Sequence, residues 1–176
     1  MKLLLDCCCG PCATHCIEIL KNEYEVILFS SNYNIHPKEE YEKRLASLKK
    51  LAEIYDLPLI ILEYRPNEWF DAIKGHENDK EGGERCKICF KFRLKKAAEW
   101  AANHNIPIFT TTLTISPHKK SSDIIEIGEQ LALIYNIKFL NKDFKKKDGF
   151  KKSVELSKKY SLYRQNYCGC IFSKNH

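Results

Sequence analysis

Short apolar runs alternate with longer amphipathic segments along the whole chain. The apolar runs predict five strands, at residues 2–5, 25–30, 59–63, 108–113 and 137–140. Between and after them, apolar positions recur at helical spacing, as at Leu48, Leu51 and Tyr55. These segments predict helices at about residues 12–22, 37–55, 89–104, 121–135 and 149–160.

The order of strands and helices indicates the fold class. Connections long enough for crossovers favour a parallel sheet that is covered on both faces. We therefore expect one α/β domain over residues 1–176, doubly wound around a mainly parallel five-stranded sheet of the Rossmann-like, HUP-like kind. Ligands bind such sheets at the carboxyl ends of the strands. The site edge should then contain residues 6–12, 31–36 and 114–118. The polar stretch 75–85, with three glycines, should form a mobile loop before Cys86.

Composition narrows the class of protein. The chain has 176 residues, of which 44% are hydrophobic and 30% charged, which excludes a disordered polyelectrolyte. Nine cysteines are many, but they stay below the ~8–10% typical of a small disulfide scaffold. The N-terminus lacks the apolar stretch of a signal peptide, and no run is long enough to span a membrane. We therefore expect a cytoplasmic protein without a membrane partner, whose thiols are kept reduced.

The positive charge is concentrated near the C-terminus. The formal charge is 29 − 23 = +6. Residues 1–137 hold 18 Lys/Arg and 20 Asp/Glu, whereas residues 138–176 hold 11 and 3, a net charge of +8. Such a basic segment is either a solvated lysine-rich helix or a surface that faces a polyanion.

Two groups of cysteines have the spacing of metal ligands. Cys86 and Cys89 form a C-x-x-C pair at a predicted helix start, where the helix dipole favours thiolates. Alone, that pair is also compatible with a redox pair or with coincidence. Cys8, Cys9 and Cys12 lie in a second cysteine-rich loop, after the first strand. The two loops together predict a four-thiolate site. Adjacent cysteines favour an iron–sulfur cluster over a zinc ion, because the several irons of a cluster are spread over a few ångströms.

The remaining cysteines suggest other tasks. A disulfide between Cys168 and Cys170 would close a very small, readily reduced ring, so this pair is a candidate two-electron store, and metal ligation is the alternative. The preceding segment 163–167 holds two tyrosines and an arginine that can stack on bases and reach phosphates, or simply pack. Cys16 is expected to be a buried apolar residue. For Cys7, burial and ligation are equally consistent with the pattern.

Two histidines and one absence complete the site edge. His36 and His118 end two of the expected loops, as substrate contacts or surface residues rather than assigned catalysts. A glycine- and serine-rich phosphate loop is missing after the first strand, where the sequence reads DCCCGPC. This argues against adenylation chemistry.

With these residues the chain resembles the cobalamin-independent epoxyqueuosine reductases of the QueH type. The resemblance extends over nearly the whole chain, and its last segment, LYRQNYCGC, is the most specific. It rests on four segments: Cys8-Cys9-Gly10-Pro11-Cys12; Glu84-Arg85-Cys86 with Cys89-Phe90 and Arg93-Leu94; Ser116-Pro117-His118-Lys119; and residues 162–170. It implies reduction of epoxyqueuosine to queuosine at the wobble position of tRNAs with GUN anticodons, in queuosine biosynthesis, with an external electron donor.

The resemblance also implies site residues. It assigns a [4Fe–4S] cluster to Cys8, Cys9, Cys86 and Cys89, places a second iron beside it, and makes Cys168 and Cys170 a redox-active disulfide. Relatives often carry a histidine and an apolar residue where this chain has Asp6 and Cys7. Our candidates for the second iron are therefore Cys12 and Asp6. The candidate RNA contacts are Tyr163, Arg164, Gln165, Asn166 and His118.

Two alternatives belong to other classes. A thiol–disulfide oxidoreductase or redox sensor would use Cys86 and Cys89 as its active pair and would work without iron. A zinc-stabilised RNA-binding module would need neither turnover nor the pair Cys168 and Cys170.

Overall fold

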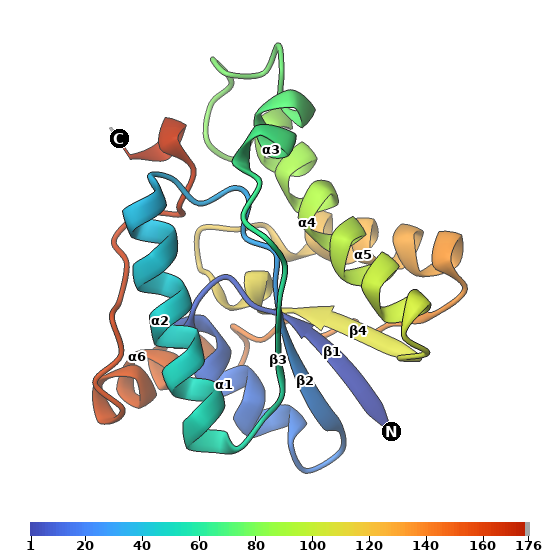
Figure 1. Cartoon of the computed structure of the whole chain (residues 1–176), viewed down its shortest axis with the longest axis vertical. Helices are drawn as coiled ribbons and strands as arrows, with labels where there is room; N and C mark the ends of the chain where they lie inside the picture. The colour runs from blue at the N-terminus through green and yellow to red at the C-terminus, as the bar shows by residue number, and fades with distance from the viewer. Residues whose placement is uncertain (175–176) are drawn as a thin grey trace.

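The computed structural model describes residues 1–174 and contains one five-stranded sheet (Figure 1). The strand order is β3-β2-β1-β4-β5, and every neighbouring pair is parallel, so the doubly wound α/β prediction is confirmed. The last two positions of the expected domain and of its basic segment, 175 and 176, lie outside the described residues. The strands are β1 (Lys2–Asp6), β2 (Glu25–Ser30), β3 (Leu59–Ile61), β4 (Ile108–Thr111) and β5 (Lys138–Phe139).

The helices follow the predicted pattern with two differences. The short helix α3 was not expected, because seven residues are too few to show a helical period. Helix α4 begins at Glu84 rather than at Cys89, so both cysteines of the C-x-x-C pair are helical. In residues 1–174, no helix is both long and apolar enough to cross a membrane. The helices are α1 (Gly10–Leu20), α2 (Lys38–Tyr55), α3 (Pro66–Ala72), α4 (Glu84–Asn103), α5 (Ser121–Tyr135) and α6 (Gly149–Lys159), with 3-10 turns η1 (Thr112–Ile115) and η2 (Ile171–Ser173).

Strand β1 is buried from both sides, and its side chains alternate between the two faces of the sheet. Leu3 and Leu5 pack in the core under α1 and α2, and Cys7 continues this face beyond the strand. Leu4 packs in the core under α4 and α5, and Asp6 faces Arg93 of α4. The alternation therefore places Asp6 and Cys7 on opposite faces.

The strand order brings the ends of β1 and β4 together. The chain leaves β1 for α1 on one face and reaches β4 from α4 on the other, which is the topological switch point where α/β sheets bind ligands. The loop after β1 contacts η1 there: the backbone N–H of Cys8 donates to Thr112 Oγ1 at 3.3 Å.

The C-terminal segment, residues 161–170, runs along α2 back to this edge (Figure 1). Near the end of α2, Lys50 Nζ donates to the carbonyl of Ser161 at 3.3 Å. Near the start of α2, the backbone N–H of His36 donates to the carbonyl of Gly169 at 2.7 Å. The pair Cys168 and Cys170 is therefore delivered to the site edge.

Candidate functional site

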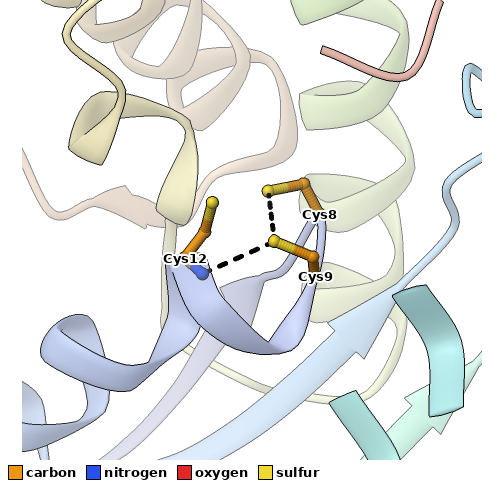
Figure 2. Close-up of side chains that lie close together, drawn as sticks. All are labelled: Cys8, Cys9 and Cys12. Carbon is orange, nitrogen blue, oxygen red and sulfur yellow. Dashed lines mark hydrogen bonds between the residues drawn. The ribbon is translucent and has the colours of Figure 1, made fainter. Parts of the chain in front are cut away.

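Three thiols of the first cysteine loop gather at the carboxyl end of β1 (Figure 2). The sulfur atoms of Cys8, Cys9 and Cys12 all lie within 4.8 Å of one another, and those of Cys8 and Cys9 are 3.6 Å apart. Cys9 is buried, while Cys8 and Cys12 are half-buried. Among residues 1–174, this is the only group of three or more such side chains whose ligand atoms are close enough to share one metal ion.

The local sequence explains this geometry. Cys9 is the N-cap of α1, and its sulfur accepts a hydrogen bond from the backbone N–H of Cys12 at 3.4 Å. Pro11 lies in the first turn of the helix, where its missing N–H leaves no donor unpaired. Gly10 lets α1 approach α2, because a Cβ at this position would lie 2.3 Å from Ser47 Oγ. The Gly-Pro turn therefore sets three sulfurs at the positive end of a helix.

The pKa values of the three thiols are shifted in different directions. Hydrogen bonds from the Cys12 and Cys9 thiols lower the pKa of Cys8 well below its usual range. Burial raises the pKa of Cys9, and the interaction with Cys8 raises that of Cys12. Three neighbouring thiolates in a buried place repel one another, and a bound cation relieves that repulsion. The donor set therefore suits a thiophilic metal centre.

Asp6 has a different environment from the one expected of a metal ligand. The Nη2 of Arg93 donates to both carboxylate oxygens of Asp6, at 2.8 and 3.0 Å, and Thr111 Oγ1 donates to one of them at 2.8 Å. Both charged side chains are buried. The carboxylate is thus neutralised by an ion pair under the cysteine loop, and Cys12 is the candidate second-iron residue that the structure brings to the thiol group.

Cys86 and Cys89 lie at the beginning of α4, the helix that also carries Arg93. The positive charge of Arg93 helps to lower the pKa of both Cys8 and Cys89. Burial raises the pKa of Cys89 to about 12 and also raises that of Cys86, whose sulfur accepts from the Gly82 N–H at 3.2 Å. These two cysteines do not join the compact group of three.

The C-terminal pair packs beside the C-x-x-C pair. Cys170 is buried in one apolar cluster with Cys89 and Trp69, and Cys168 packs against that cluster. Neither cysteine is in a disulfide, and Cys168 Sγ lies 3.1 Å from Ser173 Oγ. Hydrogen bonding from the Cys170 thiol lowers the pKa of Cys168 to about 5, and the same contact raises the pKa of Cys170. The pair thus combines one thiolate with one thiol.

The candidate RNA contacts divide into inward and outward side chains. Gln165 turns inward, and its Nε2 donates to Cys9 Sγ at 3.0 Å and lies 3.6 Å from Cys12 Sγ. Tyr163, Arg164 and Asn166 are exposed, as is His118 on the loop after η1. The segment therefore contacts the thiols through Gln165 and exposes Arg164, Asn166 and part of Tyr163, whose hydroxyl donates to Glu40 at 2.7 Å.

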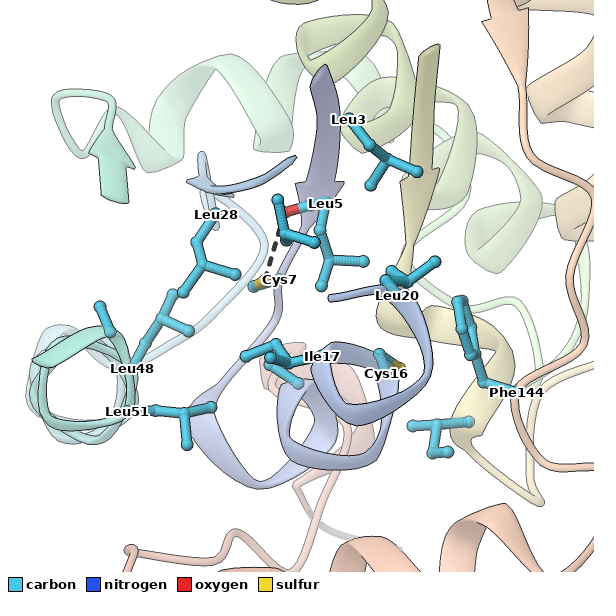
Figure 3. Packing of buried hydrophobic residues seen from close by; sticks show 14 of the residues in the cluster. Leu3, Leu5, Cys7, Cys16, Ile17, Leu20, Leu28, Leu48, Leu51 and Phe144 are labelled. Atoms are coloured by element: carbon cyan, nitrogen blue, oxygen red, sulfur yellow. Dashed lines mark hydrogen bonds between the residues drawn. The ribbon is translucent and has the colours of Figure 1, made fainter. Parts of the chain in front are cut away.

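Two further cysteines are part of the core (Figure 3). Cys7 and Cys16 are fully buried, and their thiols donate to the carbonyls of Leu5 and Cys12, at 3.2 and 3.3 Å. Burial raises the pKa of both well above the usual range. They are neutral packing groups in this structure, as the sequence pattern suggested for Cys16.

His36 is also buried rather than exposed. Its ring lies against Trp69 and Phe70, with centroids 5.0 and 4.6 Å away. Burial lowers the pKa of His36 to about 4, so the imidazole is neutral at pH 7. His36 is therefore a packing residue beside the C-terminal pair, where its backbone N–H binds the Gly169 carbonyl, and not an exposed substrate contact.

Sequence reasoning assigned no role to two buried arginines that organise the site, Arg44 and Arg93. Arg93 lies on the buried face of α4 with Leu94 and Ala97, and Arg44 lies on the buried face of α2 with Leu48. Each arginine stands among apolar residues on the buried side of its helix. That position could have indicated a buried ion pair, since arginine is rarely buried without a partner.

The chain is similar to named proteins over nearly its whole length. The profile of the family described as "Epoxyqueuosine reductase QueH" matches residues 3–176. The protein of that name from Streptococcus pyogenes is 37% identical over 178 residues, covering 98% of this chain and 70% of the relative. That from Haemophilus influenzae is 38% identical over 174 residues, covering 98% and 71%. That from Thermotoga maritima is 37% identical over 174 residues, covering 97% and 89%.

Two solved structures share the fold at low sequence identity. One is a predicted subunit of tRNA methyltransferase from Methanocaldococcus jannaschii, with a TM-score of 0.59, 18% identity and coverage of 90% of this chain and 74% of the other. The second is the U34-tRNA thiolase NcsA from Methanococcus maripaludis with its [4Fe–4S] cluster, with a TM-score of 0.59, 14% identity and coverage of 98% and 61%. The fold is common to all three, whereas the full-length sequence similarity is specific. The chain belongs to the epoxyqueuosine reductase QueH family of oxidoreductases.

Proposed function

We propose that this chain reduces epoxyqueuosine to queuosine at the wobble position of tRNAs with GUN anticodons, using an iron–sulfur cluster, an adjacent iron and a reversible Cys168–Cys170 disulfide. The observation that carries the proposal is the path of the C-terminal segment. Along this path Gln165 Nε2 donates a hydrogen bond to Cys9 Sγ at 3.0 Å, and Cys170 packs in one cluster with Cys89. The segment that carries the candidate dithiol thus contacts both loops that hold the candidate metal ligands.

The cluster ligands of the proposal are Cys8, Cys9, Cys86 and Cys89, with Cys12 at the second iron. The close sulfurs of Cys8, Cys9 and Cys12 support it, as does the positive charge of Arg93, which favours the thiolate form of both Cys8 and Cys89. A cluster spreads its irons over a few ångströms, so its ligands need not meet within the distance that suits one ion. The [4Fe–4S] cluster of the archaeal thiolase with this fold agrees with such a group here.

The reaction needs two electrons and two protons. Two C–O bonds of the epoxide break, the carbon atoms keep an alkene, and the oxygen leaves as water. Oxidation of the Cys168 thiolate and the Cys170 thiol to a disulfide supplies two electrons and one proton, and the second proton comes from solvent. An external dithiol reductant reopens the disulfide. A bound cluster supplies electrons singly, and an iron beside it supplies Lewis acidity toward an oxygen. The thiolate and thiol pair at Cys168 and Cys170 suits this role.

The RNA partner is matched by charge and by exposed side chains. The basic segment 138–176 carries a net charge of +8 and contains Tyr163, Arg164 and Asn166. The guanidinium of Arg164 lies 5.0 Å from the centre of the Phe150 ring, which holds it at the surface. An anticodon loop is single-stranded, so its bases can be splayed onto such side chains. A cytoplasmic location belongs to the same proposal.

The test uses anaerobically purified protein, tRNA that carries epoxyqueuosine, and dithiothreitol as reductant. Mass analysis of the digested tRNA should show loss of one oxygen atom per modified nucleoside. The protein should be brown, with about four or more irons per chain. Cys168→Ser and Cys170→Ser should keep the iron and lose multiple turnover. Cys16→Ala, which changes a buried core thiol, should keep both iron and activity.

Other outcomes would favour the competing functions. A colourless, zinc-loaded protein that binds tRNA without changing it would support an RNA-binding module. A metal-free protein that reduces protein disulfides at its full rate would support a thiol–disulfide oxidoreductase. Either result contradicts the proposal.

A further inference from the structure

One buried arginine of α2 holds the backbone just before the Cys-Gly-Cys pair. The side chain of Arg44 is 1% exposed. Its Nη2 donates to the carbonyl of Tyr167 and its Nη1 to the carbonyl of Cys168, each at 3.0 Å. Its Nε donates to Glu40 Oε1 at 2.7 Å. All three kinds of guanidinium nitrogen are therefore engaged, two of them by the C-terminal segment.

The charge of Arg44 is balanced by the carboxylate of Glu40, which also binds the C-terminal segment. Glu40 is buried, and its second oxygen accepts a hydrogen bond from the Tyr163 hydroxyl at 2.7 Å. The guanidinium also lies over the Tyr167 ring, 5.2 Å from its centre. A buried ion pair costs desolvation unless its remaining donors and acceptors are satisfied. Here the segment 163–168 satisfies them, so folding of α2 and docking of the segment are coupled.

The backbone of the pair is shaped for this contact. Gly169 has a φ of +115°, which side chains rarely adopt. A Cβ there would lie 2.9 Å from Arg44 Nη1 and 3.1 Å from Ile35 Cγ1. Since the backbone N–H of His36 holds the Gly169 carbonyl, the loop is fixed between α2 and the strand edge.

We propose that Arg44 is a positioning residue, which holds the Cys168-Gly169-Cys170 loop against the cysteine site through the two carbonyls that precede the glycine. The importance of this position for turnover rests on the proposed function, while the anchoring itself does not. A forked guanidinium can hold two carbonyls and a carboxylate together, whereas a lysine ammonium is a point charge that cannot copy this geometry.

Tryptic release of peptide 165–174 tests the anchoring without any activity. Arg164 is exposed, but the backbone that follows it is held on α2. Cleavage after Arg164 and release of the peptide therefore report when the segment leaves α2. In Arg44→Gln the peptide should be released at least about tenfold faster than in the wild type, because two charge-assisted hydrogen bonds are lost. Arg44→Lys should fall between them. Lys49→Gln, which removes an exposed charge from the same helix, is the matched control and should release it at the wild-type rate.

Gly169→Ala probes the same contact from the loop side and leaves α2 intact. It should also accelerate release, and adding it to Arg44→Gln should bring little further change, because both break one contact. If Arg44→Gln does not fold, Gly169→Ala decides alone. Wild-type release rates in folded Arg44→Gln, or in Gly169→Ala, overturn the anchoring.

Kinetics on epoxyqueuosine-containing tRNA test the consequence for turnover. Misplaced thiols should lower kcat of Arg44→Gln about tenfold or more and leave KM within about twofold, with partial recovery in Arg44→Lys. A change in KM alone would overturn the positioning role. If the wild type has no reductase activity, the proposed function fails, and the proteolysis result on Arg44 still stands.

Discussion

The side-chain amide of Gln165 donates a hydrogen bond to the sulfur of Cys9 at 3.0 Å, although 156 positions separate the two residues. Cys9 caps the first helix, and Gln165 belongs to the segment that returns along α2. The contact joins the first cysteine loop to the C-terminal pair, so the candidate metal ligands and the candidate dithiol form one structural unit.

Gln165→Leu removes this donor while keeping the size of the side chain. A hydrogen bond to a ligand sulfur stabilises the electron-rich, reduced state of a metal centre. We therefore expect the iron content to remain, the midpoint potential of the centre to fall, and turnover to slow. Asn166→Leu alters the exposed neighbouring side chain and should leave the potential unchanged. Identical potentials in Gln165→Leu and the wild type would contradict this role.

The Asp6–Arg93 ion pair predicts that Asp6 supports the site without binding iron. Asp6→Asn leaves the buried Arg93 cation without its partner and should destabilise the fold by about 3–5 kcal/mol. The double variant Asp6→Asn with Arg93→Met removes both charges and should recover most of that loss. Urea unfolding measures both effects.

Iron analysis of the folded double variant tests whether Asp6 is a ligand. If Asp6 is a structural partner, the double variant keeps the wild-type iron content. Loss of about one iron per chain from a protein with recovered stability would instead make Asp6 a ligand of the second iron.

The sequence determined the fold more clearly than the site. Strand and helix periods placed β1, β2, β4 and the long helices, because apolar stripes of 11 to 20 residues have an unmistakable period. Helix α3 has seven residues, and the start of α4 lies in a polar stretch, so neither shows that pattern. The expected loop 75–85 is therefore shorter, and Arg85 is buried with its side chain against the carbonyls of Glu77 and Asp79.

The cysteine chemistry was visible in spacing, whereas its geometry was not. Spacing along one loop predicted that Cys8, Cys9 and Cys12 lie together, since Cys8 and Cys9 are adjacent and Cys12 follows Cys9 by about one helical turn. The inward turn of Gln165 depends on how residues 161–170 cross α2, and no local pattern encodes that path. The spacing of four residues between Glu40 and Arg44 is compatible with an ion pair on one helix face. The hydrogen bonds from Arg44 to the Tyr167 and Cys168 carbonyls are tertiary contacts, which no local pattern indicates.

Gly10 predicts a packing limit at the start of α1. In Gly10→Ala the new Cβ would lie 2.3 Å from Ser47 Oγ and 2.6 Å from the Ser47 carbonyl oxygen. Helices α1 and α2 must then separate, at a cost of about 1–3 kcal/mol in the free energy of unfolding. Ser47→Ala alone should be nearly neutral, because its hydroxyl is buried without a partner. It should not rescue Gly10→Ala, since the backbone of Ser47 also blocks the Cβ, and full rescue would contradict this account.

The C-terminal pair predicts a pH-dependent thiol reactivity that differs between its two members. The pKa of Cys168 is lowered to about 5 by the Cys170 thiol, so Cys168 is ionised at pH 7 and becomes protonated as the pH falls through about 5. Iodoacetamide labelling of the reduced protein, followed by mass analysis of peptide 165–174, should therefore be constant from about pH 6.5 to 8 and drop below that midpoint. Cys170 should stay unlabelled over this range, because its pKa is raised. Cys170→Ala removes the donor and should move the midpoint of Cys168 upward, toward the value of about 8.5 of a free cysteine. A wild-type midpoint already near that value would show that the two thiols do not share a proton, and would remove the chemical basis for using them as an unequal, disulfide-forming pair.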